Sequence, residues 1–234
     1  MPRLDGTIGA LKRYMSENGI DRSVIQSIAT KPEQSRKITD WSRGIEDASI
    51  TAFSSVHPDS PDWREEIDAI RDAGLKGIKF HPDYQKFYVD DPRIFPIYER
   101  IFNCGLMVLF HAGVDIGLKP PYRNTPDRML KVVKAFRGGR IILAHLGGFR
   151  YWDDVEKHLI GEDIWLDTSY TIGWAPDDQV RRIISGHGYN RVLFATDSPW
   201  ADQIEEIAKL KALKLESEAC DAILYKNALT LLGS

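Results

Sequence analysis

Residues 141–148 read Ile-Ile-Leu-Ala-His-Leu-Gly-Gly, an apolar run that ends on a histidine and is followed by glycines. Two other runs have the same form: Leu-Met-Val-Leu-Phe-His-Ala-Gly at 106–113 and Val-Leu-Phe-Ala-Thr-Asp-Ser-Pro at 192–199. Near-continuous apolar runs of this kind are typical of strands covered on both faces. In each run a side chain able to bind a metal ion stands where the strand is expected to end. The pattern predicts a parallel sheet with polar groups gathered at its carboxyl edge.

Strands alternate with helical segments along the whole chain. Further strands are expected at 23–28, 49–56, 77–80 and 164–169, and helical periodicity covers 7–18, 35–46, 60–72, 92–102, 125–136, 152–159, 176–185, 201–213 and 217–232. This alternation favours an α/β fold of the (β/α)₈ TIM-barrel type, built as a single domain over 1–234. Only seven strands are recognisable and the chain begins with a helix, so we expect an incomplete barrel whose first strand is missing.

Composition narrows the class of protein. Hydrophobic residues make up 43% and charged residues 28%, and the formal net charge is −3. These values are ordinary for a globular protein and give no electrostatic case for binding nucleic acid or an anionic membrane. No apolar run reaches 18 residues and the first residues carry no signal-peptide pattern, so a cytoplasmic protein is expected. Cys104 and Cys220 lie outside any CxxC motif and are expected to be buried free thiols.

Histidines and one aspartate stand at the carboxyl ends of the expected strands. His57, His81, His111 and His145 each follow a strand, and Asp197 follows the last one. Period-2 alternation predicts the shared faces: His111 with Leu109, His145 with Leu143, Asp197 with Ala195, and His81 with Lys79. Imidazole and carboxylate groups suit zinc and similar divalent ions, so a metal site is expected, with hydrogen-bonded structural histidines as the alternative. His158 and His187 are expected outside the site, and His57 beside it.

Three loops after these strands have features of a binding pocket. Residues 113–124 form a long Gly- and Pro-rich segment, which we interpret as a lid or pocket wall, or else a passive surface loop. Tyr84 in 82–88 and Trp174 in 170–174 combine aromatic and polar groups suited to a small organic substrate, although loop aromatics also serve in packing.

Taken together these motifs resemble the amidohydrolase superfamily, in the branch called amidohydrolase-related or amidohydrolase 2. The resemblance covers nearly the whole chain and rests on segments 77–85, 109–113, 144–148, 194–200 and 227–233. It implies a metal-dependent barrel enzyme. Residue by residue it implies His111 as the fifth-strand metal ligand, His145 as a ligand or polarising group, and Asp197 as a ligand and proton shuttle. Lys79 stands where some relatives carry a carboxylated bridging lysine; it can equally be a free ammonium that pairs with a substrate carboxylate.

One departure from the family pattern concerns the metal. The family's first strand carries a His-x-His pair, and no His-x-His occurs in this sequence. A shortened amino terminus, a degenerate member, and a neighbouring subunit that supplies the strand are the three explanations. His111, His145 and Asp197 would still offer three protein ligands, with zinc expected and manganese as the alternative.

The sequence is compatible with three functions. The first is a metal-dependent hydrolase of an amide, lactam or lactone, with Asp197 as general base and His145 steadying the developing oxyanion. The second is a metal-dependent decarboxylase, a lyase. The third is a catalytically impaired homologue without metal. In the first two, Lys79, His81, Tyr84 and Trp174 are expected to bind the small-molecule substrate, and a homo-oligomer is possible.

Overall fold

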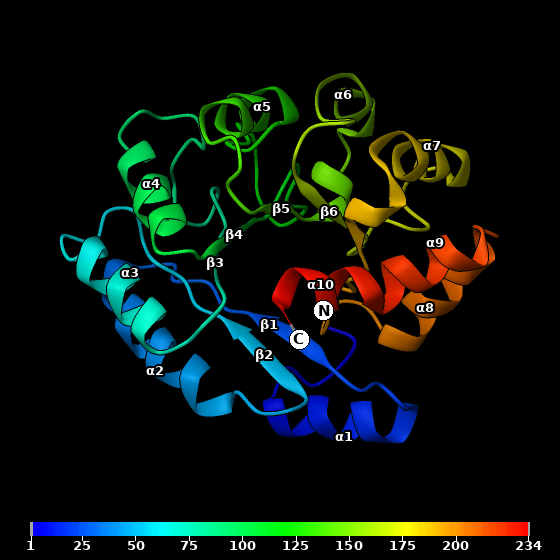
Figure 1. Ribbon diagram of the computed structural model, residues 1–234, viewed down its shortest axis with the longest axis horizontal. Helices are drawn as coiled ribbons and strands as arrows, with labels where there is room; N and C mark the ends of the chain where they lie inside the picture. The colour runs from blue at the N-terminus through cyan, green and yellow to red at the C-terminus, as the bar shows by residue number, and fades with distance from the viewer. Residues whose placement is uncertain (1, 234) are drawn as a thin grey trace.

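Seven parallel strands alternate with helices in residues 2–233, the part of the chain that the computed structural model describes (Figure 1). The strands are β1 (Ser23–Gln26), β2 (Ile50–Phe53), β3 (Gly77–Phe80), β4 (Met107–Phe110), β5 (Ile141–Leu143), β6 (Trp165–Asp167) and β7 (Val192–Leu193). The helices are α1 (Ile8–Asn18), α2 (Ser35–Ile45), α3 (Trp63–Asp72), α4 (Phe95–Asn103), α5 (Pro126–Ala135), α6 (Trp152–His158), α7 (Asp177–His187), α8 (Gln203–Ala212), α9 (Ser217–Asp221) and α10 (Asn227–Leu232). A π-helical turn, Ala222–Lys226, joins the last two.

The strands form one curved row in chain order. β1 pairs with β2, and β3 to β7 form a five-stranded sheet. Ser54 joins the two sheets, because its N–H donates to the Gly77 carbonyl at 3.0 Å and its carbonyl accepts from the Lys79 N–H at 2.8 Å. No strand pairing between β1 and β7 occurs in residues 2–233, so the barrel stays open there. The expected α/β barrel of seven strands is therefore confirmed; we call the gap between β1 and β7 the seam.

The C-terminal helical segment covers the β7 side of the seam. The Phe194 N–H donates to the Ile223 carbonyl at 2.8 Å. The side-chain amide of Asn227 donates to the carbonyls of Tyr189 and Val192, both at 2.7 Å. These bonds satisfy backbone groups that an edge strand would otherwise leave open.

Helix α1 crosses the seam on the outside. Thr7 caps its first turn and Gly19, at φ 66°, ends it. The Tyr14 hydroxyl donates to Asp202 ahead of α8 at 2.6 Å. On the other side Lys12 pairs with Asp47 ahead of β2 at 2.6 Å. The ring of helices is thus continuous where the ring of strands is not (Figure 1).

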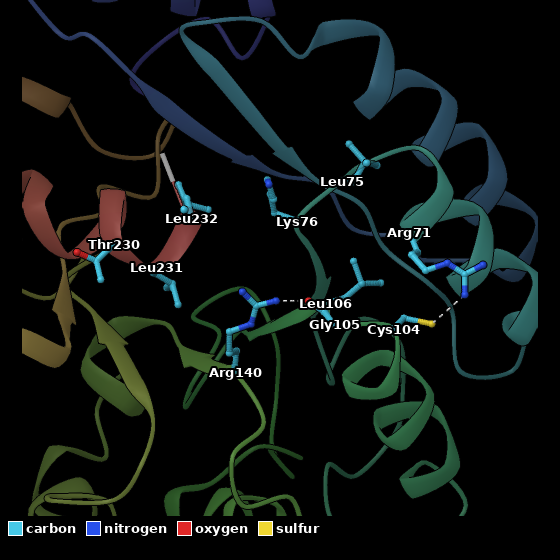
Figure 2. Close-up of a pocket in the computed structure, with 12 residues that line it drawn as sticks. Arg71, Leu75, Lys76, Cys104, Gly105, Leu106, Arg140, Thr230, Leu231 and Leu232 are labelled. Atoms are coloured by element: carbon cyan, nitrogen blue, oxygen red, sulfur yellow. Dashed lines mark hydrogen bonds between the residues drawn. The ribbon is translucent and has the colours of Figure 1, made fainter.

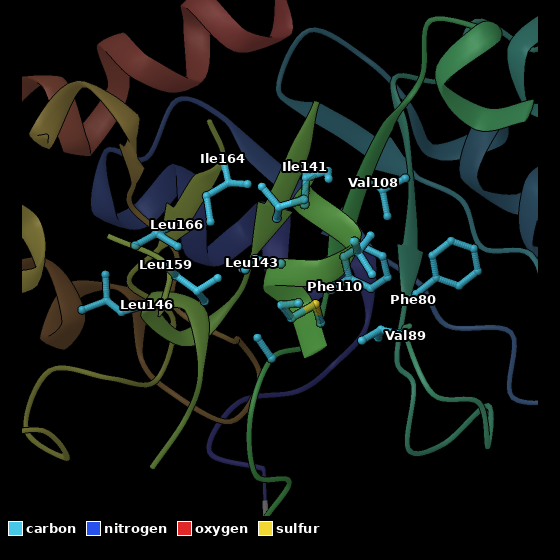
Figure 3. Close-up of a cluster of buried hydrophobic side chains, with 14 of the residues drawn as sticks. Phe80, Val89, Val108, Phe110, Ile141, Leu143, Leu146, Leu159, Ile164 and Leu166 are labelled. Carbon is cyan, nitrogen blue, oxygen red and sulfur yellow. The ribbon is translucent and has the colours of Figure 1, made fainter. Parts of the chain in front are cut away.

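Alternation along the strands builds two apolar layers. Outward side chains such as Phe80, Val108, Phe110 and Leu143 pack against the surrounding helices (Figure 3). A second cluster, Phe53, Met107, Leu109, Ile142, Ala144 and Leu193, packs against Leu231 of α10. Figure 1 shows α10 inside the ring of helices, so this helix fills part of the barrel interior. Polar side chains lie instead at the carboxyl ends of the strands.

Helix starts are where the sequence predictions erred most. Helix α3 begins at Trp63 with Asp62 at its N-cap, rather than at residue 60. The Ser60 hydroxyl instead donates to Glu66 at 2.9 Å and is buried. Both cysteines are free and half-buried. Within residues 2–233 no helix has both the length and the apolar character needed to span a bilayer.

Candidate active site

Polar side chains gather at the carboxyl ends of β3 to β6. Lys79, His81, His111, His145 and Asp167 are each at most 8% exposed. Four neighbouring strands therefore point ionisable groups into one buried region. Burial of so many such groups costs free energy unless each is paired, neutral or ligating, so their partners decide what the site can do.

His145 reaches this region through a backbone turn. Ile141 and Leu143 pack in the outer layer, so simple alternation would carry His145 outward, and the predicted face shared with Leu143 is wrong. The chain instead turns through positive φ at His145 (59°) and Leu146 (49°). The His145 N–H donates to the Asp167 carboxylate at 3.1 Å, which holds the turn. The predicted neighbourhood of His145 and His111 is nevertheless correct.

Hydrogen bonds define the proton positions on the two histidines. His145 Nδ1 lies 2.8 Å from the Ser169 carbonyl oxygen, which only accepts, so Nδ1 carries a proton. With its proton on Nδ1, His145 can accept at Nε2 from His111 Nδ1, 3.0 Å away. Burial lowers the pKa of His111 well below its ordinary value, so this imidazole is neutral and its proton resides on Nδ1. The lone pair of His111 lies on Nε2, which is buried without a hydrogen-bond partner among the described residues.

His81 and Asp115 stand beside that lone pair. The imidazoles of His81 and His111 stack at 4.0 Å between ring centres, and His81 Nε2 lies 3.1 Å from the Asp115 carboxylate. Burial lowers the pKa of His81, while the bond to His81 lowers the pKa of Asp115. Ligand atoms of His81, His111 and Asp115 all lie within 4.8 Å of one another, the only such trio in residues 2–233. Sequence reasoning missed Asp115, whose one signal is its place four residues after His111 in the expected lid loop.

Gly113 allows the loop to bring Asp115 back. Its φ is 89°, and a Cβ there would lie 2.2 Å from the Phe149 nitrogen. The Phe149 N–H donates to Ala112 and the Phe149 carbonyl accepts from Val114, so the loop is paired with the segment after His145. Asn124, at the far end of the loop, donates to the His111 carbonyl at 2.8 Å. The 113–124 loop is thus attached to the site at both ends.

The structure places Asp197 apart from this trio. It follows β7 at the seam, is exposed and has a φ of 62°. Its charge still acts on the region, because it opposes the lowering of the Lys79 pKa that burial causes. Lys79 is 7% exposed and donates to the Gln26 side chain of β1 at 3.2 Å. The sequence-predicted set of His111, His145 and Asp197 is therefore only partly assembled.

Aromatic side chains surround the polar cluster. Tyr84 stacks on His81 at 4.0 Å and is 40% exposed. Trp174, 47% exposed, packs on Phe149, which in turn contacts His145 with 6.0 Å between ring centres. Both predicted substrate-binding aromatics thus stand at the margin of the cluster. Their exposed faces are available for a planar or apolar group.

Two further histidines, His187 and His57, have hydrogen-bond partners of their own. His187 ends α7, where its Nε2 lies 3.0 Å from the Ile164 carbonyl. His57 is buried and accepts at Nδ1 from the Asp59 N–H. A cavity of about 460 Å³ opens at the other end of the strands, where Lys76, Arg140 and α10 line it (Figure 2). None of the polar strand-end residues lines that cavity.

The donor set fits a divalent cation. His111 Nε2 is a buried lone pair without a partner, and a second imidazole and a carboxylate lie within ligand reach of it. Two neutral imidazoles and one carboxylate form a donor set found in catalytic zinc sites, where three protein ligands leave one position open.

Known proteins share this architecture. A 5-carboxyvanillate decarboxylase from Sphingomonas paucimobilis superposes with a TM-score of 0.80 at 16% identity, over 99% of this chain and 84% of that one. A dihydroxybenzoic acid decarboxylase from a Polaromonas species, with bound manganese and 2-nitroresorcinol, gives 0.73 at 16% identity, over 99% and 87%. A probable 2-pyrone-4,6-dicarboxylic acid hydrolase from Acinetobacter baumannii, with citric acid bound, gives 0.75 at 12% identity, over 98% and 90%.

At these identities the structural likeness establishes the fold alone. A search of curated protein sequences gives no significant match. The sequence itself matches the family described as "Amidohydrolase" (Amidohydro_2) over residues 2–234, that is, over nearly its whole length. This confirms the resemblance drawn from the strand-end motifs. The chain belongs to the amidohydrolase family.

Proposed function

We propose that this protein is a metal-dependent hydrolase of a small organic substrate with an amide, lactam or lactone bond. The observation that carries the proposal is the buried lone pair on His111 Nε2, set among ionisable groups at the carboxyl edge of the barrel. A divalent ion bound there supplies a Lewis acid that polarises a carbonyl and lowers the pKa of a water to about 7.

The chain's own residues then have separate tasks. Asp197, exposed at the edge of the site, takes the proton of the attacking water. His145 steadies the charge that develops on the carbonyl oxygen; this role requires a proton on its Nε2 once the hydrogen bond to His111 opens. Lys79 pairs with a substrate carboxylate, and His81, Tyr84 and Trp174 line the binding region. We further propose that these residues belong to one domain.

Decarboxylation is the second candidate. Two of the structural neighbours described above are decarboxylases of aromatic acids, and Lys79 offers a buried amine to a carboxylate. In this reaction the same residues bind the substrate, carbon dioxide leaves, and a proton takes its place on the carbon. The two reactions differ in product, so one assay separates them.

The test is turnover by the purified protein loaded with Zn²⁺ or Mn²⁺. Small lactones, lactams and amides are offered beside hydroxylated aromatic acids, with the carboxylate product followed by chromatography and carbon dioxide collected separately. A new carboxylate without carbon dioxide is expected, and Asp197→Asn is expected to lower kcat by roughly 10²–10⁴-fold. Asp178→Asn, which removes an exposed carboxylate of α7, is the matched control. Release of carbon dioxide alone would refute the hydrolase.

A further inference from the structure

We infer that the cavity at the amino ends of β3 to β5 is a binding site for a small organic carboxylate. The carboxylate group pairs with Lys76 and Arg140, and a short apolar body packs on Leu106 and Leu231, all of which line the cavity. The site lies at the opposite end of the strands from the candidate active site, so the inference goes beyond the proposed function and does not depend on it.

The sheet brings the two cations to one edge. Lys76 directly precedes β3 and Arg140 directly precedes β5, and β4 pairs with both of these strands. The Lys76 carbonyl accepts from the Met107 N–H at 3.0 Å, and the Arg140 carbonyl accepts from the Val108 N–H at 2.9 Å. The two residues therefore flank β4 at nearly the same level, with about 9–10 Å between their backbones. Two side chains of this length can both reach a carboxylate that lies between them.

Neither of these cations is balanced by a carboxylate within residues 2–233. Arg71, the third cation of the lining, differs because it pairs with Asp68 at 3.1 Å. Arg140 donates to the neutral carbonyl of Gly105 (Figure 2), and the Lys76 amine has no hydrogen-bond partner in the described part of the chain. No acidic side chain of this part lines the cavity. An anion bound there gains charge-assisted hydrogen bonds without breaking an existing ion pair.

Apolar side chains supply most of the remaining lining. Leu75, Leu106 and Leu231 are 3%, 4% and 9% exposed. Figure 2 shows Leu231 and Leu232 of α10 on the side of the cavity opposite Leu106. The volume of about 460 Å³ lies within the range of about 300–1,000 Å³ that is usual for small-molecule sites. A cationic edge beside apolar walls is complementary to an amphipathic anion rather than to an inorganic one.

The end of α10 opposes an anion only weakly. The last carbonyls of a helix carry the equivalent of about half a negative charge. One of them, on Leu229, already accepts from the Gly233 N–H, because Gly233 adopts a φ of 69°. Lys76 and Arg140 contribute two full positive charges, so the lining attracts anions overall.

Binding of hexanoate to the full chain tests the inference. Amide chemical shifts are followed by NMR while hexanoate, acetate or hexanamide is added to the wild type. Hexanoate is expected to bind in the millimolar range and to shift the amides of residues 105 and 106. Acetate and hexanamide are expected to bind about 10-fold more weakly or worse, because acetate lacks the apolar body and hexanamide lacks the charge.

Three variants locate the carboxylate group. Lys76→Gln and Arg140→Gln are each expected to raise the Kd of hexanoate by about 5-fold or more, because each removes a charged donor. Arg137→Gln is the matched control, since this arginine is exposed three residues before Arg140 and does not line the cavity. Its Kd is expected to stay within about 2-fold of the wild type, where surface charges are screened. Thermal unfolding shows whether each variant is folded.

Cys104 gives a second readout that needs no variant. Its thiol lines the cavity and is half-buried, whereas Cys220, equally half-buried, lies in α9 outside the lining. Saturating hexanoate is expected to slow alkylation of Cys104 by iodoacetamide by about 3-fold or more, because thiol reactivity depends on access. Cys220 is expected to react at an unchanged rate. Peptide mass spectrometry measures both rates in one sample.

A wild type that does not bind hexanoate would overturn the inference, as would hexanamide binding as tightly as hexanoate. Loss of hexanoate binding in Lys79→Met, with Cys104 unprotected in the wild type, would place the carboxylate in the candidate active site and overturn it equally. None of these measurements uses turnover, so a failure of the proposed hydrolase would leave the result unchanged.

Discussion

The β3–β4 region and the seam between β1 and β7 differ in how well their strands are paired and buried. Every residue of β3 and β4 is buried; β4 pairs with a strand on each edge, and β3 pairs with β4 on one edge and with Ser54 on the other. At the seam, β7 is two residues long and Val24 of β1 is 38% exposed. The histidines that end β3 and β4 are buried, whereas Asp197 after β7 is exposed.

This difference shows what a parallel sheet contributes to a site. Where both edges of a strand are paired, the backbone holds the next side chain in one place. At the seam, helices replace a strand: α10 covers β7 through Asn227, and α1 crosses outside through Tyr14. Helices close the surface but do not direct a strand end toward the site.

The largest expected contrast is in core stability. Phe110→Ala removes a ring at 0% exposure that packs on Phe80 and Tyr98. It is expected to lower the free energy of unfolding by about 4 kcal/mol, whereas Val24→Ala at the seam costs about 0.5 kcal/mol. Urea unfolding of both variants measures the difference. Equal losses would mean that the seam is packed as firmly as β3 and β4.

The next contrast sets Gly113 beside Gly173, two glycines with nearly the same φ, 89° and 92°. Gly113→Ala places a methyl group against the Phe149 backbone, whereas at Gly173 the nearest atom is in the Lys209 side chain at 3.8 Å. We expect a loss of about 3 kcal/mol for Gly113→Ala and about 1 kcal/mol for Gly173→Ala. A Gly113 variant as stable as the Gly173 variant would show that the loop relaxes freely.

The smallest expected effect concerns the contact between α10 and β7 at the seam. Asn227→Ala removes the amide that serves two carbonyls and is expected to cost about 2 kcal/mol. Thr230→Ala is the matched control: its hydroxyl donates to the carbonyl of Lys226, the residue that precedes α10, and its loss is expected to cost about 0.5 kcal/mol or less. Hydrogen exchange at the Phe194 N–H should rise in the first variant alone. Unchanged exchange would mean that α10 does not protect the β7 edge.

Much of the site could be predicted from one-dimensional patterns. Apolar runs ending in His111 and Asp197 identify strand ends, since buried parallel strands need continuous apolar residues. The strand-end location of His81 and Lys79 follows in the same way. Asp115 could not be found by this reasoning, because loop conformation depends on contacts such as that between Gly113 and Phe149, 36 positions apart.

The sequence by itself determined the strand–helix alternation, the incomplete barrel and the edge at which the ionisable groups gather. These features depend on local periodicity and on the general geometry of parallel sheets. Only the tertiary structure decided which of those groups meet. His145 turns inward through positive φ against Asp167, and Asp115 returns to His81, because long-range hydrogen bonds hold backbone conformations that no local pattern encodes.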